Sequence, residues 1–171
     1  MRDRILIVGF FVGLAIMAFL PSCGIYSFTG ASIPPEAKTF SVSYFPNNAQ
    51  LIQPTLSARF TEALQDKFLK QTNLRLVDGG GDLHFDGSIT GYTTAPAAIG
   101  GDDRAALNRL TISVRVKFIN EFEPENDFER TFSRYWDYPS TRSLAEIEDE
   151  AITIITEALV EDIFNQAVVN W

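Results

Sequence analysis

The sequence predicts an α+β fold in which two helices pack on one face of a four-stranded sheet, in the order β-α-β-β-β-α. Two segments carry apolar residues at helical spacing, and four segments alternate apolar and polar residues as strands do. These elements follow one another through short connections. At 171 residues, of which 46% are apolar, the chain has the size of one domain preceded by a segment of different character.

The first residues have the layout of a bacterial secretory signal. Two arginines give a basic start, residues 5–20 carry no charge, and small or turn-forming residues follow. This apolar run is shorter than the roughly 20 residues that a membrane-spanning helix needs, and no polar face marks it as a core helix. We expect residues 1–22 to be removed, residues 23–36 to form a lipidated tether and residues 37–171 to form one domain.

The only cysteine, Cys23, follows this signal directly. Leu20, Ser22 and Cys23 resemble the lipobox of bacterial lipoproteins, although Pro21 departs from the usual residue at its position. The thiol of such a cysteine accepts a diacylglyceryl group, and after cleavage the new amino terminus takes a further acyl chain such as palmitate. A disulfide within the chain is excluded because there is no second cysteine. Two or three acyl chains, at about 0.8 kcal/mol per buried methylene, hold a protein on a membrane. We therefore expect a membrane-tethered domain with covalent lipid and no other cofactor.

The mature part of the chain is acidic. Removing Arg2, Arg4 and Asp3 from totals of 14 basic and 22 acidic residues leaves 12 and 21, a formal net charge of −9. Such a charge argues against nucleic acid as a partner. It also opposes an encounter with an anionic leaflet, so lipid chains must supply the membrane affinity.

The first half of the domain predicts a strand, a helix and a turn. Residues 39–45 alternate apolar and polar side chains, which predicts a half-buried strand with Tyr44 among its inward-facing residues. Pro54 can occupy the first turn of a helix, and apolar residues at four-residue spacing continue it to near Asn73. The run VDGGGD at 77–82 lacks the Gly-Lys-Ser/Thr of a phosphate loop and is interpreted as a turn.

The middle of the chain predicts two more strands. Residues 83–89 alternate as a strand, with Gly87 and Gly91 suited to a bulge or a close contact. Small residues at 94–106 predict a long loop. Residues 110–118 alternate without exception and form the most regular of the expected strands.

The last third predicts a loop, a strand and a helix. The acidic stretch at 121–128 is interpreted as a solvated hairpin loop, although its four carboxylates could also gather a divalent cation. The fourth strand follows at 128–138. Ser143 and Glu146 form a capping box at the start of the final helix, whose apolar stripe includes Ile154 and which continues to the last residues.

A search for catalytic residues finds no convergent set. The single histidine, His84, lies on the solvent side of its strand, and Cys23 is committed to lipid. The sequence has no Gly-x-Ser-x-Gly and no cluster with metal-ligand spacing. We therefore expect a protein without enzymatic activity, without catalytic residues and without a metal site.

The last predicted strand mixes arginines and aromatic residues on one side, among them Arg130, Arg134 and Trp136. An edge strand whose arginines reach water or pair with loop acids explains this pattern. The functional alternative is a cation and aromatic surface for a lipid headgroup, a sugar or a protein. Arg115 and Lys117 point away from the core on the neighbouring strand and would extend a positive patch if they shared that face. These five residues are the candidate binding residues.

Several stretches, taken together, are similar to the LptE family of lipopolysaccharide-assembly lipoproteins, in the form found in Bacteroidota. They are the lipobox, CGIYSFTGASIP, YFPNNA, TEALQDKFLKQTNL, GDLHFDGSITGY, ALNRLTISVRVKF and LVEDIFNQAVVNW. The resemblance implies a lipoprotein in the inner leaflet of the outer membrane, on the periplasmic side. It also implies that the domain plugs the lumen of the LptD β-barrel, helps to assemble it and assists insertion of lipopolysaccharide into the outer leaflet.

The resemblance assigns no binding residue position by position. Arg115, Lys117, Arg130, Arg134 and Trp136 are therefore candidates for lipopolysaccharide or partner binding on a local argument alone, because phosphates need charge-assisted donors. The alternative is a non-enzymatic lipoprotein, periplasm-facing or on the cell surface, that binds another envelope glycolipid or protein. No acidic residue closely follows the cysteine, where surface-exported lipoproteins of this phylum carry acids, so the periplasmic side is favoured.

Overall fold

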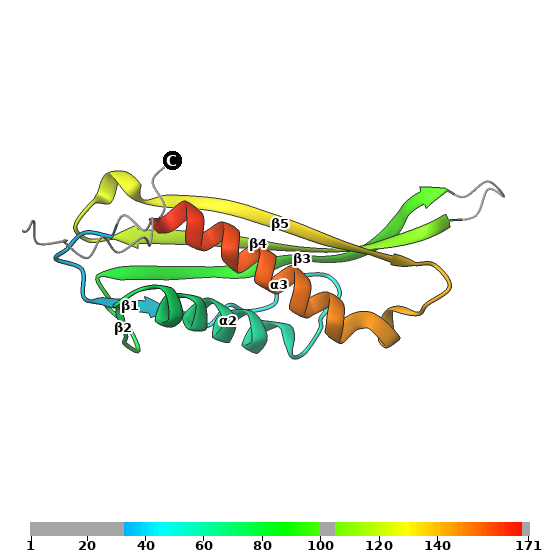
Figure 1. Ribbon diagram of the computed structural model, residues 1–171, viewed down its shortest axis with the longest axis horizontal. Coiled ribbons are helices and arrows are strands. Elements are labelled where there is room, and N and C mark those ends of the chain that lie inside the picture. The colour runs from blue at the N-terminus through cyan, green and yellow to red at the C-terminus, as the bar shows by residue number, and fades with distance from the viewer. Residues whose placement is uncertain (1–32, 100–104, 169–171) are drawn as a thin grey trace, which may run out of the picture.

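The computed structural model describes residues 33–99 and 105–168. These residues form a five-stranded mixed sheet with two helices packed on one of its faces (Figure 1). The α+β class and the two-helix layer are confirmed, and the sheet has one strand more than predicted. The expected signal segment, Cys23 and most of the expected tether lie outside the described residues.

The strands lie in the order β2-β1-β3-β4-β5 across the sheet. Their bounds are Thr39–Val42 for β1, Arg75–Leu76 for β2, Leu83–Ile99 for β3, Ala105–Asn120 for β4 and Phe128–Pro139 for β5. β1 pairs in parallel with β2 and β3, whereas β3, β4 and β5 form an antiparallel meander. The unpredicted strand is β2, whose two residues are too few to show an alternating pattern.

The hairpin of β3 and β4 is longer than the sequence predicted. The expected loop at 94–106 was wrong for residues 94–99 and 105–106, because the two strands remain paired as far as Ile99 and Ala105. Residues 100–104 lie outside the described residues. The paired strands extend past the ends of both helices (Figure 1). Ladder hydrogen bonds use backbone groups, so small residues pair without an apolar pattern. A register shift between Pro96 and Ala98 accommodates the proline, which has no N–H to donate.

The glycines of β3 act as predicted. The register shifts between Ile89 and Gly91, as expected of a bulge. A Cβ at Gly87 would lie 2.0 Å from the carbonyl oxygen of Arg115 and 2.7 Å from the ring of Phe45. Only a residue without a side chain fits this close approach of β3 to β4.

The VDGGGD segment forms a turn between β2 and β3, as predicted. A Cβ at Gly81 would lie 2.5 Å from the carbonyl carbon of Phe40, so the turn can pass close to β1 only with glycine there. Asp82 holds the turn against the start of β1. Its carboxylate accepts hydrogen bonds from the backbone N–H of Lys38 at 2.8 Å and of Thr39 at 2.9 Å. These bonds, led by the one from Lys38, lower the pKa of Asp82.

The core lies between the sheet and helices α2 (Leu56–Gln71) and α3 (Leu144–Val168). Phe68 of α2 is at its centre, with ring centroids 5.4 Å from Phe40, 4.8 Å from Phe85 and 5.0 Å from Phe164. Since these rings come from β1, β3 and α3, one aromatic cluster joins both layers of the fold.

Two inward-facing residues were predicted wrongly. Tyr44 is 62% exposed while Phe45 is fully buried, because β1 ends at Val42 and the period of two ends with it. Ile154 is 40% exposed while Ile152 is fully buried, because α3 packs against both the sheet and α2 and so buries a broader face.

The start of α3 also differs from the predicted capping box. The N–H of Glu146 donates to the carbonyl oxygen of Ser143 at 3.2 Å rather than to its hydroxyl. The guanidinium of Arg142 lies 3.9 Å from the Glu146 carboxylate and makes an ion pair along the first turn. A backbone bond of this kind tightens the turn and satisfies the same donor.

Candidate functional site

The arginines of β5 lie on the side of the sheet that α3 covers. Arg134 donates from Nε and Nη2 to the two carboxylate oxygens of Asp162, each at 2.5 Å. Arg130 donates to the side-chain oxygen of Gln166 at 2.6 Å. β5 is an edge strand and its arginines reach solvent, as one interpretation held. Their partners come from α3, so the expected pairing with acids of the preceding loop was wrong.

The two arginines differ in how far their charge is compensated. The bidentate bond to Asp162 raises the pKa of Arg134 above its ordinary value and neutralises its charge locally. Within residues 33–99 and 105–168, Arg130 contacts a neutral amide and no carboxylate, so its positive charge is not compensated there. Both side chains are partly open to solvent, as expected for stems that cross an apolar surface to reach water.

Trp136 belongs mainly to the core. Its ring is partly buried and packs against the apolar cluster under α3. It stacks beside Tyr138, with ring centroids 6.4 Å apart. Trp136, like Phe128 and Phe132, is thus only partly available to a ligand, because it packs against the core.

Arg115 and Lys117 lie on the opposite face of the sheet, which neither α2 nor α3 covers (the uncovered face). In the register of the sheet Arg115 is opposite Thr131 and Lys117 is opposite Glu129. The guanidinium of Arg115 lies 2.6 Å from the Glu129 carboxylate. The condition for one patch of four cations, a shared face, is not met, and the structure divides them into two pairs.

The uncovered face carries further polar contacts that the sequence did not reveal. The hydroxyls of Ser113 and Ser133 lie 2.6 Å apart. Nearer the tip of the hairpin, the Arg109 guanidinium lies 3.6 Å from the ring centroid of Tyr135 and donates to both oxygens of Asp137, at 2.7 and 2.8 Å. The hydrogen bond from Arg109 lowers the pKa of Asp137. The alternation of side chains along each strand places these residues on one face. Which of them pair across the strands follows only from the register of β4 and β5.

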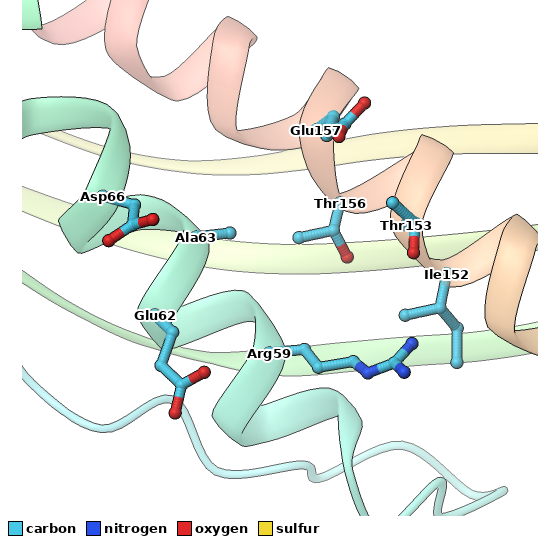
Figure 2. A pocket seen from close by; sticks show the side chains of 8 residues that line it. All are labelled: Arg59, Glu62, Ala63, Asp66, Ile152, Thr153, Thr156 and Glu157. Atoms are coloured by element: carbon cyan, nitrogen blue, oxygen red, sulfur yellow. The ribbon is translucent and has the colours of Figure 1, made fainter. Parts of the chain in front are cut away.

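A groove of about 440 Å³ separates the two helices on the outer side of the helical layer. In Figure 2, Ala63 and Thr156 lie between the two helices, whereas Glu62 and Glu157 extend outward from either side of the groove. Its lining residues are Arg59, Glu62, Ala63, Asp66, Ile152, Thr153, Thr156 and Glu157. No pattern in the sequence indicated this groove, because the groove depends on how the two helices pack.

The acidic loop before β5 uses its polar groups within the turn. A short 3-10 helix, Pro124–Asn126, lies at its centre. The Asp127 carboxylate accepts from the backbone N–H of Asn120 at 2.7 Å, and Glu123 accepts from the Asn126 amide at 2.8 Å. Over residues 33–99 and 105–168, no group of three or more potential ligands is arranged to hold a metal ion.

Residues 37–167, well over half of the chain, match a family model described as LptE, lipopolysaccharide-assembly. The chain belongs to the LptE family. The resemblance of the sequence stretches is thereby confirmed. A comparison with curated proteins finds no match.

Two of the solved structures compared share this fold at low sequence identity. The minor lipoprotein from Acinetobacter baumannii is 15% identical with a TM-score of 0.51, over 76% of this chain and 91% of its own. A hypothetical protein from Chlamydia trachomatis is 10% identical with a TM-score of 0.52, over 78% of this chain and 99% of its own. Rare lipoprotein B from Shewanella oneidensis gives a TM-score of 0.46 at 11% identity, over 75% and 90%.

Membership in the LptE family gives the protein's broad role. LptE proteins are non-enzymatic lipoproteins of lipopolysaccharide assembly, and lipoproteins of this type are associated with the outer membrane. In the part of the chain that the structure describes, neither helix combines the length and apolar character needed to cross a bilayer.

Proposed function

We propose that this LptE-family protein is held in the inner leaflet of the outer membrane by lipid chains on Cys23, on the periplasmic side. There it plugs the lumen of the LptD β-barrel, helps the barrel to assemble and assists insertion of lipopolysaccharide into the outer leaflet. The observation that carries this proposal is the family match over residues 37–167.

The polar, uncovered face of the sheet supports a plug. It combines charged pairs, such as Arg115 with Glu129, with the paired hydroxyls of Ser113 and Ser133. The interiors of outer-membrane barrels are polar, so a barrel wall can offer hydrogen-bonding and charged partners to such a face. The other sheet face is already covered by α2 and α3.

Within this function, we propose that lipopolysaccharide phosphates bind at one of the two basic pairs. Phosphate oxygens need charge-assisted donors. Arg115 and Arg134 each already pair with a carboxylate, whereas Lys117 and Arg130 form no ion pair among the residues that the structure describes. Lys117 on the uncovered face and Arg130 at the edge of β5 are therefore the cations with charge to offer. Trp136 lies on the same side of β5 as Arg130, six residues or about 20 Å further along the strand.

Two double variants distinguish the pairs. R115A/K117A removes the cations of the uncovered face, and R130A/R134A removes those of β5. Binding of purified lipopolysaccharide to detergent-solubilised protein should weaken about tenfold in one of them, the loss of roughly one charge-assisted contact. Circular dichroism spectra confirm that each variant is folded. Unchanged affinity in both would exclude all four cations.

The main proposal is tested by purification of the full-length protein from detergent-solubilised outer membranes through a C-terminal tag. We expect a large β-barrel protein to be recovered in a near-equal molar amount. A C23A variant expressed in the same way provides the control, because it should not reach the outer membrane and should recover little barrel.

The alternative function predicts a different result. A lipoprotein that binds another glycolipid or envelope protein would be recovered without a barrel, whether the tagged protein faces the periplasm or the cell surface. Recovery of the tagged protein alone from the outer-membrane fraction would contradict the plug function.

A further inference from the structure

The groove between α2 and α3 contains two buried polar atoms that have no hydrogen-bond partner within the described residues. They are Nη1 of Arg59 and the hydroxyl oxygen of Thr156. Thr156 is only 4% exposed, and Figure 2 shows its side chain between the two helices on the groove side. Buried polar groups destabilise a fold when they remain unpaired, so a ligand that pairs with them removes that cost and gains affinity.

Two ion pairs join the helices at the ends of this groove. Arg59 Nη2 donates to Asp149 at 2.7 Å, and the Lys67 ammonium pairs with Glu161 further along both helices. Residues 59 and 67 of α2 are separated by about 12 Å along the helix axis at 1.5 Å per residue. An extended peptide of three to four residues covers that length at about 3.3 Å per residue.

The mouth of the groove is acidic. Glu62, Asp66 and Glu157 line it, and only Asp66 has an ion pair among the described residues, with Lys70 at 2.8 Å. Ala63 and Ile152 supply apolar surface between these charges. An anionic ligand such as a phosphate is disfavoured here by Glu62 and Glu157, whose carboxylates favour a cation.

We propose that the groove between α2 and α3 binds an extended, Lys- or Arg-bearing peptide segment of a protein partner. A peptide carbonyl oxygen accepts from Arg59 Nη1, and the Thr156 hydroxyl pairs with the next backbone amide or carbonyl. The apolar stem of the basic side chain lies against Ala63 and Ile152, and its charged end pairs with Glu62 or Glu157. This site lies on the opposite side of the molecule from Arg115 and Lys117 and does not depend on the lipopolysaccharide proposal.

A peptide is favoured over a free small cation because the groove presents both kinds of partner. The carboxylates at the mouth need positive charge, whereas Arg59 Nη1 needs an acceptor and cannot bind a second cation. A backbone with alternating carbonyl and N–H groups provides both along one chain. The extended form also leaves every second side chain free to point out of the groove.

The test uses ¹⁵N-labelled full-length protein in neutral detergent micelles. It is titrated with the blocked peptide acetyl-Gly-Lys-Gly-Lys-Gly-amide, and amide shifts are followed by NMR. We expect saturable shifts of the amide signals of residues 59–66 and 152–157. The affinity should fall at high salt because the contacts are ionic. The matching peptide with Glu in place of Lys should cause no shift, and 1,5-diaminopentane should bind at least tenfold more weakly.

Two variants separate binding from folding. E62Q/E157Q should weaken the Lys peptide about tenfold, while the matched surface pair E121Q/E125Q leaves affinity unchanged. T156V should weaken the peptide about fivefold and at the same time raise the melting temperature, because it removes an unpaired buried hydroxyl without changing side-chain volume. T131V on the uncovered sheet face serves as its control.

Several results would overturn the proposal. One is the absence of shifts in the groove, and another is equal binding of the Lys and Glu peptides. Binding of diaminopentane as tight as that of the peptide would assign the groove to a small cation instead. An unchanged peptide affinity in T156V would show that the buried hydroxyl takes no part.

Discussion

Phe68 lies where α2 meets both the sheet and α3, and its truncation is the sharpest test of how the two layers hold together. The ring is fully buried and lies within 5.4 Å, centroid to centroid, of three other aromatic rings. Phe-to-Ala changes in a core typically cost about 3–5 kcal/mol, and the three aromatic contacts favour the upper part of that range. Domains of this size have a total stability of about 5–15 kcal/mol.

The F68A variant should therefore lose a third or more of its stability, which corresponds to a melting temperature lower by about 10–20 °C. Thermal and urea unfolding followed by circular dichroism measure both quantities. L69A, at the neighbouring position that is 47% exposed, should change the free energy of unfolding by less than about 0.5 kcal/mol. A decrease of less than about 1.5 kcal/mol in the free energy of unfolding of F68A would contradict the conclusion that this ring joins the two layers of the core.

Three further predictions follow from the fold and the anchor. G87A should destabilise the protein by about 1–3 kcal/mol in urea unfolding, because its Cβ would meet the Arg115 carbonyl oxygen at 2.0 Å, whereas G79A, with no atom within 4 Å of its Cβ, should be neutral. The lowered pKa of Asp82 means that its carboxylate stabilises the fold above the pKa of the unfolded state and that this contribution is lost as pH falls through the folded pKa. D82N should therefore be less stable than wild type at pH 7, and the difference should shrink as the pH falls towards about 3; a constant difference would contradict it. C23A should remain unprocessed or be lost from the membrane fraction, and normal processing would exclude the anchor.

The periodic segments could be predicted from sequence because their side-chain pattern and their burial have the same cause. The alternation from Leu110 to Phe118 and the four-residue spacing of α2 both come from a single buried face. Where backbone pairing alone sets the structure, as in β2 and at residues 94–99 and 105–106, side chains carry no pattern and the strands were missed.

The candidate site depended on register, which the sequence does not specify. Alternation places Arg130 with Arg134, and Arg115 with Lys117, but only strand pairing shows that the two sets lie on opposite faces. The partners of the β5 arginines come from α3, about 30 residues further along the chain. The groove was not predicted because Arg59 and Thr156 approach each other only after the helices pack, and no sequence pattern specifies that packing.

The central proposal, a domain enclosed by a barrel, is tested most directly by photo-crosslinking in cells from two opposite faces. A photoreactive residue is placed at Thr131, exposed on the uncovered sheet face, and another at Leu69, exposed on α2. Enclosure in a lumen predicts that both positions crosslink to the same β-barrel protein. A crosslink from one face alone, or from neither, would contradict the plug and leave a lipoprotein that docks on its partner from outside.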